Sequence, residues 1–158
     1  MANIFNEDFR DFIQALNNHS VDYLLVGGYS VILHGYARTT GDLDLWVNRT
    51  ADNYMKLVAA FDEFGLPVFD MTFNNFLDIT KYDVFTFGRP PSSIEILTNL
   101  KGLTFDEAFA NHILFKEENL QINLINYSDL IEAKKSAGRP RDLNDIEQLR
   151  KNDEHRTT

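Results

Sequence analysis

The chain has 158 residues, of which 44 % are hydrophobic and 25 % charged, a composition typical of one globular domain with its own core. No apolar run approaches the roughly 20 residues that cross a bilayer, and the acidic first residues do not resemble a secretory signal, so we expect no membrane span and a cytoplasmic location. The absence of cysteine excludes disulfides, thiolate metal sites and a cysteine nucleophile.

The net charge of −9 is unevenly distributed along the chain. Residues 1–133 hold 19 of the 24 acidic residues, whereas residues 134–158 hold five acidic and seven basic residues. An acidic body repels a nucleic-acid backbone, which argues against broad binding of duplexes. A basic C-terminal segment beside that body suits a site that must hold both metal cations and phosphate.

In the first third of the chain the hydrophobic periodicity predicts helices and strands in alternation. Apolar residues at helical spacing predict a helix over residues 6–18. The apolar run Tyr23–Val26, stopped by Gly27-Gly28, is typical of a buried strand that ends in a tight turn. A short helix is expected over Tyr29–Tyr36, and alternating residues over Asp42–Val47 predict a strand with one wet face.

The rest of the chain continues this mixture. Thr50 is expected to cap a helix that ends at Gly65, and residues 68–81 carry no clear pattern. Ser128 is expected to cap a helix that Gly138 terminates. A last helix carries Leu143, Ile146 and Leu149, and the polar residues after Asn152 are expected to fray. The remaining predicted elements are strands over Tyr82–Phe87 (followed by the loop Gly88-Arg89-Pro90-Pro91), Ser93–Leu97, Ile113–Lys116 and Gln121–Ile125, and a helix over Phe105–Asn111.

Strands interleaved with helices, and at least one hairpin, predict an α/β (α+β) domain with a mixed β-sheet flanked by helices. A doubly wound parallel fold fits less well. We expect one domain over residues 1–152, with C-terminal helices over about 127–152 and a frayed tail over 153–158.

Two aspartates on the predicted acidic strand point to metal chemistry. Asp42 and Asp44 are two residues apart, so their side chains share one face while Leu43 and Leu45 face the core. Two ionised carboxylates about 4 Å apart repel by roughly 4 kcal/mol at an effective dielectric of 20, and a bound divalent cation reverses that sign. Oxygen ligands favour Mg²⁺ or Mn²⁺ over zinc.

A strand that ends in Gly27-Gly28 and opens into a helix lets backbone N–H groups approach a phosphate. Thirteen residues separate this turn from Asp42. In this order and spacing, Val26-Gly27-Gly28 and Asp42-Leu43-Asp44-Leu45 resemble the signature of the DNA polymerase β-like nucleotidyltransferase superfamily. That superfamily uses a third carboxylate from a later strand, and its best match here is Glu95, where the superfamily more often has Asp.

The resemblance extends to both ends of the chain. Arg38-Thr39-Thr40, and the segment from Asp129 through Lys134 and Gly138-Arg139-Pro140-Arg141-Asp142 to Asp145, are similar to small bacterial nucleotidyltransferases related to the abortive-infection AbiEii toxins. Lincosamide nucleotidyltransferases have a comparable minimal size. The resemblance implies a nucleotidyltransferase fold and magnesium-dependent transfer of a nucleoside monophosphate from a triphosphate such as ATP.

The resemblance also implies roles for particular residues. Asp42, Asp44 and Glu95 would ligate Mg²⁺ (or Mn²⁺), and Glu95 could accept the proton of the acceptor hydroxyl. The implied nucleotide-binding residues are Gly27, Gly28, Ser30, Arg38, Lys134 and Arg139.

The cations and histidines have structural alternatives. Lys134 and Lys135 could instead form a solvated helix face, and Arg139 and Arg141 could cap the preceding helix or pair with Asp142 and Asp145. Arg38 could be a turn residue. His34 and His112 lack a companion at metal-ligand spacing, which argues against zinc, and His34 is expected to pack in its helix.

Three functions remain open at this point. The leading hypothesis is a nucleotidyltransferase that acts on a hydroxyl of a small molecule, protein or RNA. The others are a nucleotide-binding or regulatory module with little turnover, and a component of a toxin–antitoxin system acting on a partner protein. A homodimer that completes the acceptor cleft is a further hypothesis.

Overall fold

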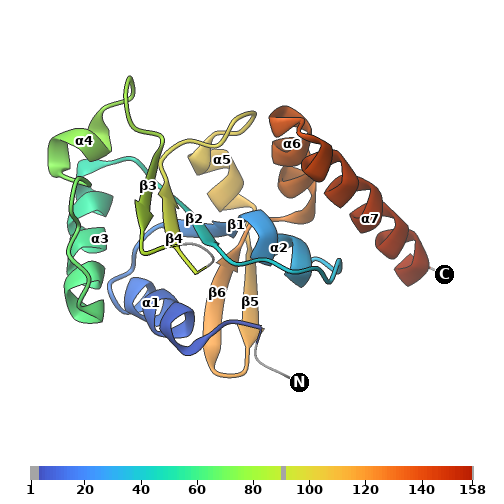
Figure 1. Cartoon of the computed structure of the whole chain (residues 1–158), viewed down its shortest axis with the longest axis horizontal. Coiled ribbons are helices and arrows are strands. Elements are labelled where there is room, and N and C mark those ends of the chain that lie inside the picture. Colours follow the sequence, from blue (N-terminus) through green and yellow to red (C-terminus); the bar gives the residue numbers. More distant parts are fainter. Residues whose placement is uncertain (1–3, 90–91, 158) are drawn as a thin grey trace.

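The computed structural model describes residues 4–89 and 92–157, which fold around a six-stranded sheet of order β3-β4-β2-β1-β6-β5 (Figure 1). Strands β1 and β6 are parallel, as are β2 and β4, and the other three neighbouring pairs are antiparallel. The predicted mixed sheet is thereby confirmed. The strands are β1 Tyr23–Val26, β2 Leu43–Val47, β3 Val84–Phe87, β4 Ile94–Leu97, β5 Ile113–Glu117 and β6 Leu120–Leu124.

Helices cover both faces of the sheet (Figure 1). Helices α1, α3 and α4 pack on one face and α5, α6 and α7 on the other, while α2 follows β1 directly. Among the described helices, none combines the length and the apolar character needed to cross a membrane. The helices are α1 Glu7–Asn18, α2 Gly27–Leu33, α3 Ala51–Phe64, α4 Phe73–Leu77, α5 Phe105–Ala110, α6 Tyr127–Ala137 and α7 Pro140–Thr157.

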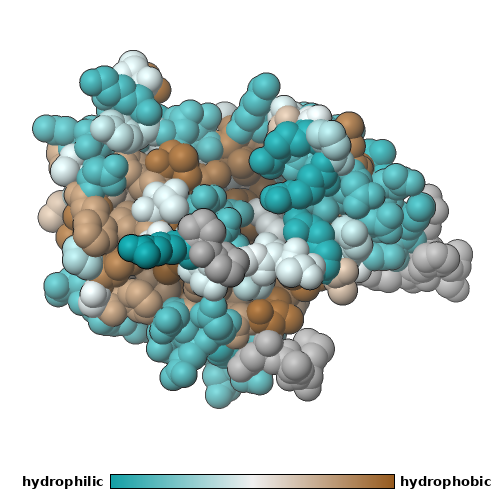
Figure 2. All heavy atoms as spheres, viewed as in Figure 1, coloured by the Kyte–Doolittle hydropathy of each residue, from teal (hydrophilic) through white to brown (hydrophobic). Residues whose placement is uncertain are grey.

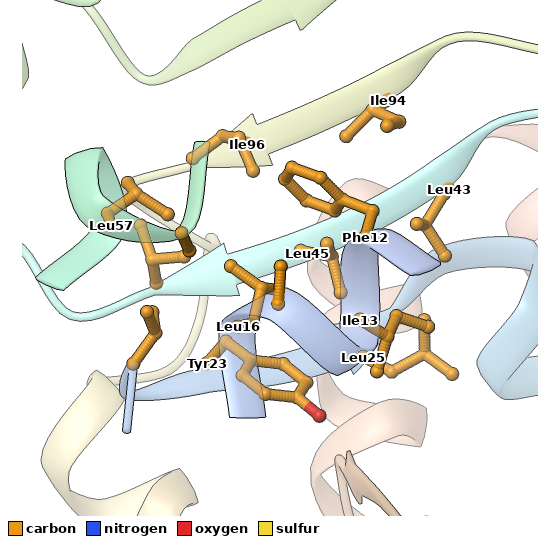
Figure 3. Close-up of a cluster of buried hydrophobic side chains, with 14 of the residues drawn as sticks. Phe12, Ile13, Leu16, Tyr23, Leu25, Leu43, Leu45, Leu57, Ile94 and Ile96 are labelled. Carbon is orange, nitrogen blue, oxygen red and sulfur yellow. The ribbon is translucent and has the colours of Figure 1, made fainter. Parts of the chain in front are cut away.

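The alternation along β2 and β4 divides the interior into two clusters. Leu43 and Leu45 of β2 and Ile94 and Ile96 of β4 point toward α1, where Figure 3 shows them against side chains such as Phe12. Burial of each such side chain contributes about 1.5–3 kcal/mol relative to exposure. On the other face Trp46 and Leu24 join a second cluster with residues of α5, α6 and α7.

The register of the central strands determines where the acidic side chains emerge. Asp44 is the cross-strand neighbour of Val26 on one side and of Glu95 on the other. Because its neighbours Leu43 and Leu45 face α1, Asp44 faces the side of the sheet that carries α6 and α7. The end of β1, which continues into α2, therefore lies beside the acidic strand.

Several predicted boundaries differ from the structure. Helix α2 begins at Gly27, in a left-handed conformation (φ +68°), and ends at Leu33, so the expected span Tyr29–Tyr36 is wrong. Helix α6 is capped by Asn126, whose side chain accepts from the Asp129 N–H at 2.8 Å, and the predicted cap Ser128 lies inside the helix. Asparagine and serine cap equally well, so local pattern alone does not separate them.

Helix α7 continues to Thr157, beyond Asn152, where fraying was expected. The i,i+4 pair Lys151–Glu147 (3.3 Å) supports the helix at the start of this segment. The unassigned segment 68–81 contains α4, capped by Thr72. Two residues of the predicted loop, Pro90 and Pro91, lie outside the described residues.

Candidate active site

A cavity of about 440 Å³ opens where β1 meets α2, at the edge of the face that α6 and α7 cover. Its lining mixes carboxylates, cations and aliphatic side chains, a composition that suits a ligand with both a charged and an apolar part. Of the nine residues that the sequence predicted for the site, the cavity brings together Gly27, Asp42, Asp44, Glu95, Lys134 and Arg139. The other residues that line it are Val26, Val84, Leu97, Leu100, Ile125, Leu130, Ala133, Ala137, Arg141 and Asp142.

Asp44 is the most perturbed of the acidic groups. Its pKa is raised from 3.8 to about 8, first by burial, then by a hydrogen bond with Glu95, and then by the charges of Glu95 and Asp42. The nearby Lys134 ammonium acts in the opposite direction. Within the described residues, Asp44 Oδ1 is buried with no hydrogen-bond partner. A divalent cation bound at this position would displace the proton that Asp44 holds at neutral pH.

Asp42 and Glu95 are both neighbours of Asp44, Asp42 along the same chain segment and Glu95 on the adjacent strand. Glu95 stands directly opposite Asp44 across the parallel β2–β4 pair. Asp42 precedes β2, and its Oδ1 accepts a hydrogen bond of 2.7 Å from the Ser93 hydroxyl. The two neighbouring cross-strand pairs are therefore Asp42 with Ser93 and Asp44 with Glu95.

The two glycines allow the acidic strand to pack closely against the β1–α2 turn. A Cβ added at Gly27 would lie 2.0 Å from Asp44 Oδ2, and the φ of +68° at Gly27 disfavours other residues. A Cβ added at Gly28 would lie 2.2 Å from Thr40 Oγ1. The motif is thus a packed unit in which the Asp44 carboxylate occupies the space that a side chain at Gly27 would need.

Ser30 lies in α2, three residues after Gly27, and does not line the cavity. Its side chain is fully buried, and its hydroxyl donates to the Gly27 carbonyl at 2.6 Å. His34, at the end of α2, is buried as expected, with Nε2 2.7 Å from the Ile125 carbonyl oxygen. Ser30 therefore stabilises the glycine turn, whereas His34 connects the end of α2 to the residue that follows β6.

Lys134 on α6 is buried, so the alternative of a solvated helix face is wrong for this residue and holds only for its exposed neighbour Lys135. Its ammonium lies 3.0 Å from Asp145 Oδ2 and 3.3 Å from Asp142 Oδ1. Both carboxylates come from α7 and are fully buried. The Lys134 ammonium therefore forms ion pairs with both acids and donates a hydrogen bond to Asp142.

The two arginines are paired with the same acids. Arg139 Nε lies 2.6 Å from Asp142 Oδ2, and its backbone N–H also donates to that oxygen, so the predicted pairing alternative describes this contact. Burial raises the pKa of Asp142, but Arg139 and Lys134 outweigh it and lower the pKa overall. Arg38 forms a bidentate pair with Asp145 (2.9 and 3.0 Å) and does not line the cavity.

The donor set of the site fits a hard divalent cation, although no group of three His, Cys, Asp or Glu side chains in the described ranges is already spaced to enclose a metal ion. The fit rests on Asp44 and Glu95. Within the described residues, Asp44 Oδ1 is buried and has no hydrogen-bond partner. The facing carboxylate of Glu95 raises the pKa of Asp44, and a cation bound between the two would remove this repulsion.

Sequence reasoning assigned no role to Ser93 or to Thr40, although Thr40 lies in the segment Arg38-Thr39-Thr40 that it named. The Ser93 hydroxyl donates to Asp42, and Thr40 lies close to Gly28, and both neighbours are set by tertiary packing. The alternating pattern of Ser93–Leu97 did carry a usable signal, because Ser93 and Glu95 are two residues apart and so share a face.

Comparisons with known proteins identify the family and the fold of the chain. The family model "Nucleotidyltransferase of unknown function (DUF6036)" matches residues 6–152. No curated protein matches the chain in sequence.

Two solved structures share the fold. The lincomycin-bound lincosamide antibiotic adenylyltransferase LnuA superposes with a TM-score of 0.56 at 15% identity, over 94% of this chain and 98% of that one. A candidate nucleotidyltransferase from Thermotoga maritima gives a TM-score of 0.53 at 14% identity, over 90% of this chain and 88% of that one. At such identities the likeness shows the fold alone. Since the family model spans nearly the whole chain, the protein belongs to the family of nucleotidyltransferases of unknown function, DUF6036, and is a transferase with a nucleotidyltransferase fold.

Proposed function

We propose that the protein transfers a nucleoside monophosphate from a nucleoside triphosphate to an acceptor hydroxyl, with Mg²⁺ or Mn²⁺ held by Asp42, Asp44 and Glu95. The observation that carries this proposal is the cavity of about 440 Å³, which gathers acidic residues, the glycine turn and three cationic side chains from segments far apart in sequence. That volume lies within the roughly 300–1,000 Å³ typical of small-molecule sites.

The donor triphosphate would bind between the glycine turn and the C-terminal helices. Backbone N–H groups at Gly27 and Gly28 are suited to phosphate oxygens. Lys134 and Arg139 would add positive charge from the opposite side, Lys134 as a point charge and Arg139 as a planar fork. Arg38 and Ser30 would act indirectly, Arg38 by holding Asp145 beside Lys134 and Ser30 by holding the Gly27 carbonyl.

In the transfer step the acceptor oxygen attacks the α-phosphorus, and the bond from that phosphorus to the bridging oxygen of the β-phosphate breaks. The bond electrons leave with pyrophosphate, and Glu95 would accept the hydroxyl proton. A bound divalent ion supplies charge neutralisation at the triphosphate and lowers the pKa of the acceptor hydroxyl. Lys134 and Arg139 would neutralise the charge that develops on the departing pyrophosphate.

The acceptor is a hydroxyl of a small molecule, a protein or an RNA. LnuA, which shares the fold, is an adenylyltransferase for a lincosamide antibiotic, and this supports a small molecule as the first class to test. The aliphatic residues of the cavity, among them Leu97, Leu100 and Leu130, would accommodate an apolar part of the donor or acceptor.

The proposal is tested by incubating the protein with Mg²⁺ and each labelled triphosphate in the presence of candidate acceptors. We expect pyrophosphate release that Asp44→Asn abolishes. Asp52→Asn makes the same chemical change at a carboxylate that is 85% exposed on α3, and it should leave the rate unchanged. Release that survives Asp44→Asn would refute the assignment of the site.

A second candidate is a nucleotide-binding module with little turnover. It is favoured by the arrangement of the carboxylates, because the pKa of Asp44 beside Glu95 is raised to about 8 and no three acidic or histidine side chains in the described residues are spaced for a metal. Binding of a labelled triphosphate without release of pyrophosphate, across all candidate acceptors, would support this module over the enzyme.

A further inference from the structure

Ser93 lies at the junction of the two acidic strands. It precedes β4 directly, and its carbonyl accepts from the Leu43 N–H at 2.9 Å, which extends the β2–β4 pairing by one step. The register that pairs Leu43 with Ile94 and Asp44 with Glu95 therefore places Ser93 beside Asp42. Since Ser93 and Glu95 are two residues apart, both side chains lie on the face that carries Asp42 and Asp44.

The Ser93 hydroxyl makes a short, charge-assisted hydrogen bond to one oxygen of Asp42. The distance from Ser93 Oγ to Asp42 Oδ1 is 2.7 Å, and Ser93 is only 1% exposed, so water does not compete readily for this contact. The bond limits rotation of the Asp42 carboxylate, which keeps Oδ2 and the second lone pair of Oδ1 as acceptors. Asp44 differs, because its Oδ1 has no hydrogen-bond partner within the described residues.

We propose that Ser93 is a positioning residue for cation binding, which acts by orienting the Asp42 carboxylate toward the Asp44–Glu95 pair. The inference rests on the proposed function, which makes Asp42 a metal ligand. Hydrogen-bond partners of metal ligands fix ligand orientation, and their loss typically weakens metal affinity about 10–100-fold. Ser93 has the geometry for this role because it directly precedes the strand of Glu95 and binds Asp42, the residue directly before β2.

The test is a Mn²⁺ titration of the whole protein without nucleotide, followed by electron paramagnetic resonance, so that no turnover is needed. Ser93→Ala should raise the Kd for Mn²⁺ about 10–100-fold. Ser92→Ala makes the same change at an exposed neighbour and should bind as the wild type does. Ser93→Thr keeps the hydroxyl and should restore most of the affinity.

A double-mutant cycle with Asp42→Asn separates positioning from general damage. If Ser93 acts through Asp42, Ser93→Ala causes no further loss of Mn²⁺ affinity when Asp42 is already Asn. An equal loss in both backgrounds, or unchanged or tighter binding by Ser93→Ala, overturns the inference. Unfolding curves in EDTA show whether each variant folds, and Ser93→Cys, with its weak donor, replaces Ser93→Ala if that variant does not.

The titration also distinguishes this inference from the proposed function. If Asp44→Asn binds Mn²⁺ as the wild type does, or if neither protein binds it, the wild type has no Mn²⁺ site here. That result contradicts both the metal site and the role of Ser93. Wild-type binding that Asp42→Asn and Asp44→Asn weaken, but Ser93→Ala does not, overturns only the role of Ser93.

Discussion

The burial of Asp44 beside the carboxylate of Glu95 makes the stability of the fold depend on pH. The pKa of Asp44 is raised from 3.8 to about 8 by burial, by its hydrogen bond with Glu95, and by the charges of Glu95 and Asp42. The folded protein therefore holds a proton that the unfolded chain releases near its ordinary pKa. Proton binding to Asp44 therefore adds to the free energy of unfolding at low pH. This stabilisation is complete below the pKa of the unfolded chain and is lost as the pH rises through about 8.

We therefore expect the metal-free wild type to lose stability relative to Asp44→Asn as the pH rises from about 5 to about 8. The difference in unfolding free energy should change by an amount on the order of a few kcal/mol, or several degrees in Tm. Thermal unfolding in EDTA across this pH range measures it. Other titrating groups are common to both proteins, so parallel curves would contradict the raised pKa of Asp44.

Gly27 has a left-handed backbone conformation and packs directly against the carboxylate of Asp44. An alanine there would carry the strain of φ +68° and a Cβ 2.0 Å from Asp44 Oδ2. Gly65 has φ +89° but open space around the position of a Cβ, so Gly65→Ala carries the backbone strain alone.

Chemical denaturation should show Gly27→Ala to be less stable than Gly65→Ala by about 1–3 kcal/mol, the usual cost of overpacking. Gly27→Ala should also reduce nucleotide binding, because Asp44 must move. Equal destabilisation by the two substitutions would mean that the contact between the glycine turn and the acidic strand is not tight.

Helices α6 and α7 are joined by buried ion pairs rather than by apolar contacts alone. Asp145 on α7 binds Lys134 of α6 and Arg38, which precedes β2, so one carboxylate connects three segments. Figure 2 shows how hydrophilic the exposed surface of these two helices is, which leaves a limited apolar face for packing. Removal of one partner from such a buried pair leaves charge without compensation.

Asp145→Asn should therefore cost about 3–5 kcal/mol of unfolding free energy, measured by urea denaturation near neutral pH. Glu147→Gln, which breaks the exposed pair with Lys151 on the same helix, should cost less than about 0.5 kcal/mol. A small effect of Asp145→Asn would indicate that the helix pair is held to the sheet without this carboxylate.

At the scale of the whole molecule, most of the architecture followed from local pattern. Period-two alternation predicted strands close to the observed β2 and β4, and with them which residues face the core and which face the cavity. Gly27, Asp42, Asp44 and Glu95, which the sequence singled out, line one cavity in the structure, and their functional roles stay predictions.

What local pattern did not predict depends on contacts between distant segments. The burial of Lys134 requires two acids from α7, and the engagement of Arg38 requires Asp145, 107 positions along the chain. Helix α4 is short, and it depends on Phe76 packing against Tyr54 of α3. Such contacts carry no periodic signal, because they join residues whose separation in sequence is set by the fold.

The account is tested most directly by a crystal structure of the protein with Mg²⁺ and a triphosphate that cannot be cleaved at the α-phosphorus. We predict density for a cation between Asp44 and Glu95, with the triphosphate between the glycine turn and Lys134. A triphosphate bound away from these residues, for example in the cavity beside Gly102 and Asn111, would contradict the central claim.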